Sequence, residues 1–387
     1  MIRFLTAGES HGPGLTGILE GMPAGLAITE AEIAADLARR QKGHGRGGRM
    51  QIETDIAKIL GGVRYGQTLG SPIALFIENR DWENWRVKMA IDDPGAELRS
   101  EKLTNPRPGH ADYAGSLKYQ QDDIRNIIER SSARETTMRV ALGAICRKFF
   151  GEFGVRVYSH VVKIGGVTAA GLESDAPLEE YFARVEKSPV RCGDASAERA
   201  MMEVIDRAVE TKDTVGGVFE VIVAGLPVGL GSFVHFDRRL DGILAQAMVS
   251  IHAMKGVEFG MGFEVADVYG SQVHDRLYPA ADGARRRTNA AGGTEGGMSN
   301  GERIVMRVAM KPLSSLMQPL DSVNLATGEA IAALRERSDV CAVPAAGIVG
   351  EAMALLALMN PFLEKYGGDS MSEIHAHAAA TPRSPWR

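Results

Sequence analysis

The sequence predicts a layered α+β fold, in which helices lie between blocks of strands and do not alternate strictly with them. Strand signals, which are β-branched runs bounded by glycine, occur at residues 56–63, 72–77, 155–164, 218–223 and 303–310. The helix start signals cluster between these blocks. This grouping favours an α+β architecture over a doubly wound parallel sheet.

Capping residues mark the first two predicted helices. Thr29 and Glu32 form a capping box ahead of an apolar face, and this helix is expected to end at Gly43. Ser132 and Glu135 form a second box, which opens a helix with apolar residues at helical spacing. The apolar face of this second helix consists of Met138, Leu142, Ile145 and Phe149.

Two further helices are predicted in the second half of the chain. One opens at Asp237 and ends at Gly256, and the other opens near Pro344. Residues 340–360 are apolar enough to be mistaken for a membrane span, but Glu351 lies in the middle of them. We therefore expect a buried core helix in this region.

Length and composition fit one large globular domain. The 387 residues are 44% hydrophobic and 24% charged, and no linker divides them. We expect a single domain over residues 1–366 and a flexible tail over residues 367–387, because the tail lacks an apolar face. The three widely spaced cysteines indicate reduced thiols, and the apolar run at the N-terminus is too short for a signal peptide. A cytoplasmic location is expected.

The densest cluster of positive charge lies at residues 39–49, which read RRQKGHGRGGR. It has five formal positive charges, four glycines and no acid, in a chain whose net charge is −5. A helix C-terminus, where cations are favoured, accounts for Arg39 and Arg40. Arg46 and Arg49 lie in a glycine loop that is costly to order, so we interpret the loop as a site for a small polyanion. The negative net charge argues against a general nucleic-acid or membrane-surface binder.

A second anion site is predicted where the Ser132 helix begins. Free N–H groups and the helix dipole favour an anion there, although Ser132 alone is more simply a cap. Arg130 and Arg134 oppose the dipole, so their presence calls for a negative partner. Residues 311–315, KPLSS, repeat the pattern of a cation with hydroxyls directly after a strand.

Two histidines stand in accessible, turn-prone contexts. His11 lies in GESHG and His110 in RPGHAD. Each could be structural, but histidines near phosphate or carboxylate groups are natural proton donors to a leaving group. The sequence contains no metal-ligand spacing, no Walker loop and no dinucleotide fingerprint after a strand, so a metal site is not expected.

Taken together, these motifs resemble the chorismate synthase family. The resemblance runs in order from residue 1 to about residue 360. Seven segments carry it: GESHG at 8–12, GHGRGGRM at 43–50, RPGHADY at 107–113, RSSARET at 130–136, DRRLDGILAQAMVSIHAMKGVEFG at 237–260, GGTEGGMSNG at 292–301 and RSDVCAVPAAGIVGE at 337–351.

The resemblance implies an enzyme that converts 5-enolpyruvylshikimate 3-phosphate into chorismate and phosphate, the last shared step towards the aromatic amino acids. In that family the reaction is an anti-1,4-elimination that needs reduced FMN although no net oxidation occurs. The usual explanation is that the flavin lends electron density as phosphate leaves and recovers it with the departing hydrogen. The resemblance also implies a β-α-β sandwich, two antiparallel sheets enclosing helices, and a homotetramer.

The resemblance implies roles for individual residues as well. One of two histidines would protonate the leaving phosphate and the other would keep the reduced flavin protonated, with help from an aspartate. These implied catalytic residues are His11, His110 and Asp339. The residues implied on the substrate side are Ser10, Arg40, Arg46, Arg49, Arg107 and Arg134. Those implied for FMN are Arg130, Ser131, Ser132, His252, Ala253, Gly296, Lys311, Pro312, Leu313, Ser314, Ser315 and Arg337.

The chain departs from the family pattern at two of these positions. His252 stands where asparagine is common, and an imidazole donates according to its tautomer and charge. Leu313 stands where polar or β-branched residues are common, so we expect a contact through its backbone.

The source of flavin reduction and two alternative functions stay open at this point. Some family members reduce flavin themselves with NADPH, but this chain lacks long insertions, so an external reductant is expected. A flavin-independent phosphotransferase is one alternative to a chorismate synthase. An anion- or RNA-binding protein that uses the 39–49 loop is another.

Overall fold

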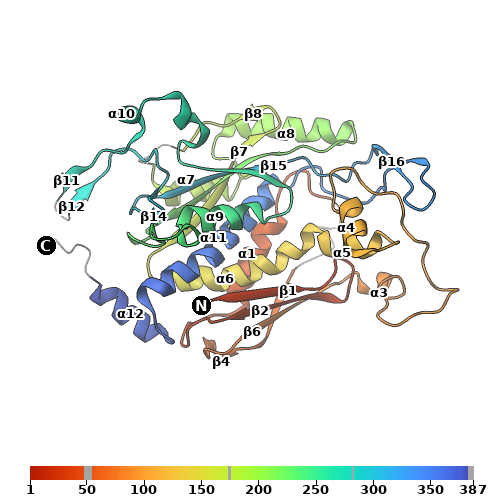
Figure 1. Ribbon diagram of the computed structural model, residues 1–387, viewed down its shortest axis with the longest axis horizontal. Helices are drawn as coiled ribbons and strands as arrows, with labels where there is room; N and C mark the ends of the chain where they lie inside the picture. Colours follow the sequence, from red (N-terminus) through yellow and green to blue (C-terminus); the bar gives the residue numbers. More distant parts are fainter. Residues whose placement is uncertain (48–54, 173–175, 281–282, 382–387) are drawn as a thin grey trace.

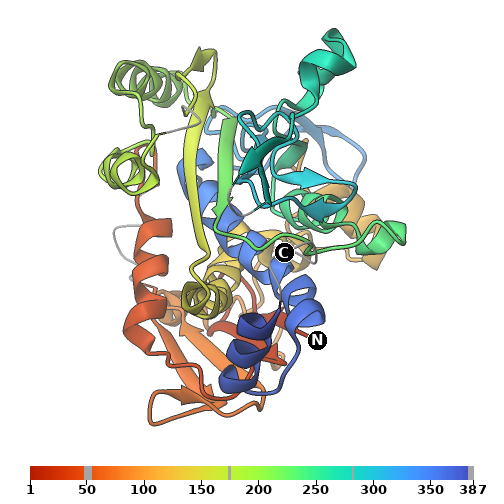
Figure 2. The ribbon, with the colours of Figure 1, turned by 90° about the vertical axis from the view of Figure 1, so that its left-hand side faces the viewer.

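Two antiparallel sheets enclose a layer of helices in the computed structural model, which describes residues 1–47, 55–172, 176–280 and 283–381 (Figures 1 and 2). The predicted α+β class is confirmed, and the arrangement is the sandwich that the family resemblance implied. All five predicted strand regions lie in these sheets, and the ends of the observed strands are within two residues of the expected ends.

The four-stranded sheet has the order β1–β2–β6–β3, and every neighbouring pair is antiparallel. Its strands are β1 (Arg3–Ala7), β2 (Gly14–Glu20), β6 (Ile73–Glu78) and β3 (Ala57–Gly61). Alternate residues of β2 and β6 point into the core, because successive side chains of a strand face opposite sides. These inward residues, all nearly inaccessible, are Leu15, Leu19, Ile73, Leu75 and Ile77.

The five-stranded sheet has the order β10–β15–β9–β7–β8 and is also antiparallel throughout. Its strands are β10 (Met254–Phe259), β15 (Ile304–Met310), β9 (Gly217–Ala224), β7 (Arg156–Ile164) and β8 (Val167–Thr168).

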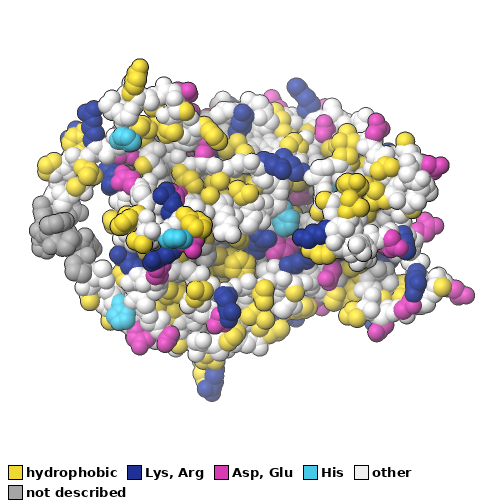
Figure 3. All heavy atoms as spheres, viewed as in Figure 1, with side chains coloured by type: hydrophobic (Ala, Val, Ile, Leu, Met, Phe, Trp, Pro, Cys, Tyr) yellow, Lys and Arg dark blue, Asp and Glu magenta, His cyan; other side chains and the backbone are white. Residues whose placement is uncertain are grey.

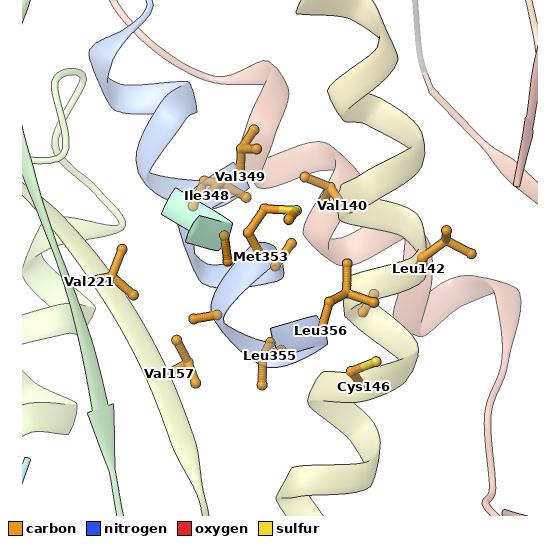
Figure 4. Packing of buried hydrophobic residues seen from close by; sticks show 14 of the residues in the cluster. Val140, Leu142, Cys146, Val157, Val221, Ile348, Val349, Met353, Leu355 and Leu356 are labelled. Carbon is orange, nitrogen blue, oxygen red and sulfur yellow. The ribbon is translucent and has the colours of Figure 1, made fainter. Parts of the chain in front are cut away.

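Three helices fill the space between the sheets. α6 (Thr136–Glu152) packs on β2 and β6, α11 (Val343–Tyr366) packs on β7 and β9, and α1 (Glu30–Gln41) contacts both helices. Figure 4 shows Met353 and Leu356 of α11 between the α6 helix and the strands of the larger sheet. The site described below is built on loops and helix ends at the margin of this core.

Shorter elements surround the sandwich. The helices are α3 (Trp82–Trp85), α4 (Asp112–Tyr119), α5 (Arg125–Ser131), α7 (Leu178–Val185), α8 (Ala195–Glu210), α9 (Leu240–Val249), α10 (Gly270–Val273) and α12 (Met371–Ala380). The 3-10 turns are Ala133–Glu135, Phe236–Arg238 and Gly262–Asp267. The hairpins are β4–β5 (Val63–Arg64, Gln67–Thr68), β11–β12 (Tyr278–Ala280, Gly283–Arg285), β13–β14 (Thr294–Glu295, Met298–Ser299) and β16–β17 (Asp321–Val323, Ala330–Ala332).

The first capping box is confirmed and the second is wrong. Thr29 and Glu32 satisfy each other's backbone N–H groups at the start of α1. Ser132 instead caps a 3-10 turn, where its Oγ accepts a hydrogen bond from the Arg134 N–H. The carboxylate of Glu135 binds other side chains and does not return to the cap.

The third predicted helix is too long. α9 ends at Val249, and residues 254–259 form strand β10, where a helix to Gly256 was predicted. Ala253 adopts a left-handed conformation with φ of 67°, which reverses the chain between the two elements. Pairing with β15 then outweighs the helical spacing of Ile251 and Met254.

The prediction of a flexible tail is wrong for residues 371–380, which form α12. Ser370 and Glu373 build a capping box at its start, and Met371 and Ile374 are buried against the core. Two apolar contacts one turn apart are enough to dock a short, well-capped helix, although they give a weak sequence signal. Residues 382–387 lie outside the described residues.

The apolar stretch near residue 350 is the core helix that was predicted. Among the described helices, α11 is the one long and apolar enough to cross a membrane, and 83% of its most apolar window is buried inside the protein. Glu351 in its middle is completely buried and forms ion pairs with Arg39 and Arg147. These pairs explain how a carboxylate is accommodated in so apolar a helix.

Candidate active site

His11 lies in the loop between β1 and β2 and is fixed by a buried carboxylate. Its Nδ1 is 2.9 Å from Glu129 Oε1, and its backbone N–H donates to Oε2 of the same residue at 2.8 Å. The N–H of buried Ser10 donates to the Glu129 carbonyl at 3.0 Å. Burial would raise the pKa of Glu129, but the hydrogen bond and charge of His11 hold it below its usual value. Because Nδ1 is bound to Glu129, a proton given to a substrate would leave from Nε2.

His110 is held in the same manner on the loop before α4. Its Nδ1 is 2.5 Å from Oδ1 of the fully buried Asp112. Arg107 binds that carboxylate through its backbone N–H at 3.0 Å and its Nε at 2.8 Å. Burial would raise the pKa of Asp112, but the hydrogen bonds from His110 and Arg107 hold it well below its usual range.

A chain of charged side chains joins these two histidine sites. Arg107 lies 3.7 Å from Glu336, which accepts a hydrogen bond from Arg125 at 2.8 Å. Arg125 also donates to Glu129 at 3.2 Å. The network therefore links loops and helices that are far apart in sequence, and it fixes the two imidazoles relative to each other.

Three of the predicted arginines form a buried cluster. Arg134 is 3.2 Å and Arg40 is 3.8 Å from the carboxylate of Asp55. The Arg40 guanidinium also donates to Thr136 Oγ1 at 3.0 Å. Burial, together with the nearby charges of Arg46 and Arg134, lowers the pKa of Arg40 to about 10. A cluster in which cations repel one another in this way is suited to binding an anion.

Asp339 anchors the glycine-rich loop that follows α1. Its Oδ2 is 2.8 Å from Arg46 Nη1, and its Oδ1 accepts from the Gly47 N–H at 2.7 Å. The Val340 N–H donates to the Gly45 carbonyl at 2.9 Å, which adds a backbone contact between the two segments. The predicted substrate residue Arg49 lies outside the described residues.

The 311–315 strip lies against the His110 loop. Lys311 Nζ donates to the Gly109 carbonyl at 3.0 Å and to Ser314 Oγ at 2.8 Å, and Ser315 Oγ accepts from Arg107 at 2.6 Å. Burial lowers the pKa of the Lys311 ammonium. The remaining members of the strip, through which its backbone runs, are Pro312 and Leu313.

The Arg130 group lies where α5 meets the end of β1. The Arg130 guanidinium donates to the Thr6 carbonyl at 2.7 Å and to the Gly8 carbonyl at 3.1 Å. Ser131 Oγ bonds back to a carbonyl of its own helix, and Ser132 caps the following turn. In this structure Arg130 joins α5 to the end of β1, and its guanidinium is still partly exposed.

His252 is half-buried just after α9, and its ring nitrogen Nδ1 is buried. Among the described residues, no group makes a hydrogen bond to its Nδ1. Burial lowers the pKa of His252; the charge of Glu135 opposes this effect and that of Arg139 adds to it. The neighbouring Ala253 carbonyl accepts from the Lys311 N–H at 3.0 Å, so His252 adjoins the 311–315 strip. A buried ring nitrogen without a hydrogen-bond partner next to this strip is suited to a polar ligand atom.

One of the predicted FMN residues, Gly296, stands apart from this group. Gly296 is at the turn of the β13–β14 hairpin, whose Gly297 carbonyl accepts from the Leu240 N–H at the start of α9. His252 follows the other end of α9, about 15 Å away for ten helical residues. Arg337 is exposed beside Glu336. Within one chain, Gly296 is therefore separated from the other implied flavin residues.

One face of the molecule is hollowed near its centre (Figure 3). In this hollow, Figure 3 shows a histidine among Lys and Arg side chains. Two cavities of about 380 and 370 Å³ lie elsewhere, one beside Phe263 and the other between β1, α9 and α11, and none of the predicted site residues lines them.

The sequence predicted the cations and histidines of the site but not the carboxylates that hold them. Asp112 lies in the RPGHADY motif and Glu135 in the RSSARET motif, so the sequence could have indicated both carboxylates. Asp55, Glu129 and Glu336 gave no such signal, because their partners are distant in sequence.

Comparison with known proteins identifies the family. The chorismate synthase family model matches residues 2–363. The chain belongs to the chorismate synthase family. It is 56% identical to the chorismate synthase of Syntrophotalea carbinolica, over 98% of this chain and 97% of the relative. It is 53% identical to that of Aquifex aeolicus, over 96% of this chain and 95% of the relative.

A solved structure agrees with this assignment. A crystal structure of chorismate synthase matches 98% of this chain and 96% of its own, with a TM-score of 0.79 and 44% sequence identity. The predicted family, α+β fold and enzyme class, a carbon–oxygen lyase that acts on phosphate, are confirmed.

Proposed function

We propose that this protein eliminates phosphate from 5-enolpyruvylshikimate 3-phosphate to form chorismate, with reduced FMN held beside the substrate. The pair of histidines, each with Nδ1 fixed by a buried carboxylate and joined by one charge network, carries the proposal. The substrate has two carboxylates and a phosphate, so a pocket that binds it needs a dense set of cations. The buried arginines supply that set.

Substrate binding falls to the arginine cluster. Arg40 is buried close to Arg46 and Arg134, and the charges of these two arginines add to burial in lowering its pKa. An anionic substrate would relieve the repulsion that lowers the pKa of Arg40. The rigid anchoring of these side chains lowers the ordering cost on binding.

The histidines supply proton transfer. With Nδ1–H bound to Asp112 or Glu129, the orientation of each imidazole is set, and a protonated ring can donate its second proton from Nε2. One histidine would protonate the phosphate oxygen as the C3–O bond breaks, and the other would hold a proton at the flavin. The hydrogen at C6 leaves in the same overall reaction.

The residues present fit a flavin phosphate and ring. Lys311, Ser314 and the orphaned His252 Nδ1 offer polar atoms beside the His110 loop, and Arg130 adds a partly exposed cation. The chemistry that reduced FMN supplies when bound is electron density, lent to the substrate as phosphate leaves and recovered with the C6 hydrogen. We keep the expectation that an external reductant supplies the flavin in reduced form and that the enzyme is cytoplasmic.

Product analysis tests this function against its rivals. With 5-enolpyruvylshikimate 3-phosphate under reducing conditions, chorismate and inorganic phosphate are expected in equal amounts. A phosphotransferase would instead move the phosphate to an acceptor without forming chorismate. An RNA-binding protein would form neither product and would bind RNA with a steep dependence on salt.

Replacing Arg46 with alanine is expected mainly to raise KM, by about 10- to 100-fold, because one charged hydrogen bond to the substrate is lost in both ground and transition states. Asp339→Asn is expected to keep the fold and FMN affinity but to lower kcat by about 10²-fold, since its proposed role is proton handling. Steady-state kinetics and FMN titration measure both variants.

If Asp339→Asn changes only KM, Asp339 acts solely by holding Arg46, and its proposed role in proton handling is wrong.

We also propose a homotetramer, by analogy with the family. The charged run 285–287 could suggest a contact between subunits, but Arg286 pairs with Glu295 at 2.7 Å and Arg287 stacks on Tyr278 within the same chain. Because these contacts account for Arg286 and Arg287 within one chain, the run does not by itself indicate a subunit interface. Light scattering at micromolar concentration is expected to give about four times the 41.5 kDa mass of one chain, and a monomer would refute the proposal.

A further inference from the structure

An exposed segment without buried side chains lies beside His11. Residues 80–102, all of which the structure describes, follow β6, and their one helix is the single turn of α3. The start of the segment is tied to the His11 loop by the buried Asn79, whose side chain donates to the Gly12 carbonyl at 2.8 Å. Figure 1 shows α3 near α5, the helix that supplies Glu129.

Trp85, the last residue of α3, covers one face of the His11 ring. The two rings are stacked with centroids 3.8 Å apart and planes 23° apart. The indole is itself oriented, because its Nε1 donates to Asp81 Oδ2 at 3.0 Å. Asp81 is tied through its own backbone N–H to Asn79. The indole and the imidazole are thus anchored to the same loop.

The stack also lies within the charge network of the site. Arg125, which pairs with Glu129, has its guanidinium 5.4 Å from the Trp85 ring centre. A cation over an aromatic face is attracted by the ring. His11 is therefore held at its edge by Glu129 and on its face by Trp85, so both its position and its tilt are restricted.

We propose that Trp85 is a positioning residue for His11, whose indole clamps the imidazole so that Nε2 stays aimed at the substrate. The indole of Trp85 donates its N–H to Asp81 and is not itself a proton-transfer group, so Trp85 acts through His11. The inference rests on the proposed function of His11 as a proton-transfer group. Aromatic pairs of this kind are weak individually, so the expected effect on the rate is about 3- to 10-fold.

Three substitutions test the clamp kinetically. Trp85→Leu is expected to lower kcat about 3- to 10-fold with little change in KM, whereas Trp85→Phe, which keeps an aromatic face, is expected to restore most of the rate. Trp82→Phe is the matched control, because Trp82 lies on the same turn and makes no ring contact with another described residue.

A double-mutant cycle separates this role from a merely structural one. In a His11→Asn background, Trp85→Leu is expected to cause no further loss of kcat, because the group it positions is gone. An equal loss in both backgrounds would overturn the proposal. An increase in KM with unchanged kcat would also overturn it, since Trp85 would then contact the substrate itself.

Fluorescence gives a readout that does not depend on turnover. An imidazole stacked on an indole quenches its emission, so His11→Ala is expected to raise tryptophan emission in the Trp82→Phe protein but not in the Trp85→Phe protein. Unchanged emission in both proteins, with normal turnover by the parent, would overturn the clamp alone. Failure of the parent to form chorismate would overturn the proposed function and the catalytic role of the clamp, whatever the emission shows.

Discussion

Replacing His11 or His110 with alanine is expected to lower kcat by ~10²–10⁴-fold, the usual contribution of a positioned proton donor, while KM and FMN affinity change little. A phosphate dianion leaves poorly without a proton. Each substitution removes the imidazole but leaves its carboxylate with another partner: Arg125 for Glu129 and Arg107 for Asp112. The fold and the anion site are therefore expected to survive, so the loss should appear in the chemical step.

His235→Ala is the matched control for both substitutions. His235 also pairs with a carboxylate, Asp237 Oδ1 at 2.8 Å, but on an exposed loop outside the site. Its replacement is expected to leave kcat within twofold of the parent, about the scatter of a surface substitution. If both site variants also turn over within a few-fold of the parent, the proton-donor assignment is wrong and phosphate leaves with arginine assistance alone.

Replacing Glu351 with alanine is expected to cost about 3–5 kcal/mol in the free energy of unfolding, because removing one partner leaves buried charges unpaired. The carboxylate accepts from Arg39 Nη1 at 2.8 Å, from Arg147 Nη2 at 2.7 Å and from Ser159 Oγ at 2.5 Å. Urea unfolding of the parent and the variant measures the difference. A cost below about 1 kcal/mol, the range of an exposed ion pair, would contradict this prediction.

Glu351 is also expected to make the stability of the fold depend on pH. Burial would raise the pKa of Glu351, but the charges of Arg39, Arg147 and Arg191 lower it from 4.5 to about 2. A carboxyl with a lowered pKa in the folded state contributes stability that is fully present above 4.5 and is lost as pH falls towards 2. The difference in unfolding free energy between the parent and Glu351→Gln is therefore expected to narrow over that interval. A difference that stays constant with pH would show that Glu351 is not ionised in the folded protein.

Glu351 also connects the core to the site. Arg39, its partner on α1, is next to Arg40 in sequence, and Arg40 points instead towards Thr136 and the arginine cluster. One helical turn thus carries one arginine bound in the core and one in the proposed anion site. The buried ion pair fixes the end of α1, from which the proposed substrate-binding loop departs.

The elements that the sequence predicted well are those with strong local signals. The Thr29 capping box and the long apolar helix around Glu351 depend on residues within a few turns of each other, and local signals are what sequence patterns report. The prediction for residues 251–256 was wrong because their apolar spacing suits either a helix or a strand. Pairing with β15, far along the chain, selects the strand. Strands β1 and β2 were not predicted, since Leu5 and Ile18 lie on an exposed face and blur the alternation.

The site shows the same division between local and distant information. Its histidines and arginines stand out in glycine-rich motifs, so their residue types could be predicted. Their partners could not, because Glu129 is 118 residues from His11 and Asp55 is 79 residues from Arg134. Only the folded chain brings these groups together. Trp85 is a further case, since nothing in its own segment indicates that it stacks on His11.

The most direct measurement is an anaerobic assay with 5-enolpyruvylshikimate 3-phosphate and dithionite-reduced FMN, in which chorismate is followed by its absorbance. Turnover is expected with reduced FMN and is expected to be absent with oxidised FMN or without flavin, because the elimination needs the electron density that the reduced ring supplies. Omitting the protein while keeping dithionite and FMN gives the background rate. Turnover at the full rate with oxidised FMN, or with no flavin at all, would contradict the proposed reaction.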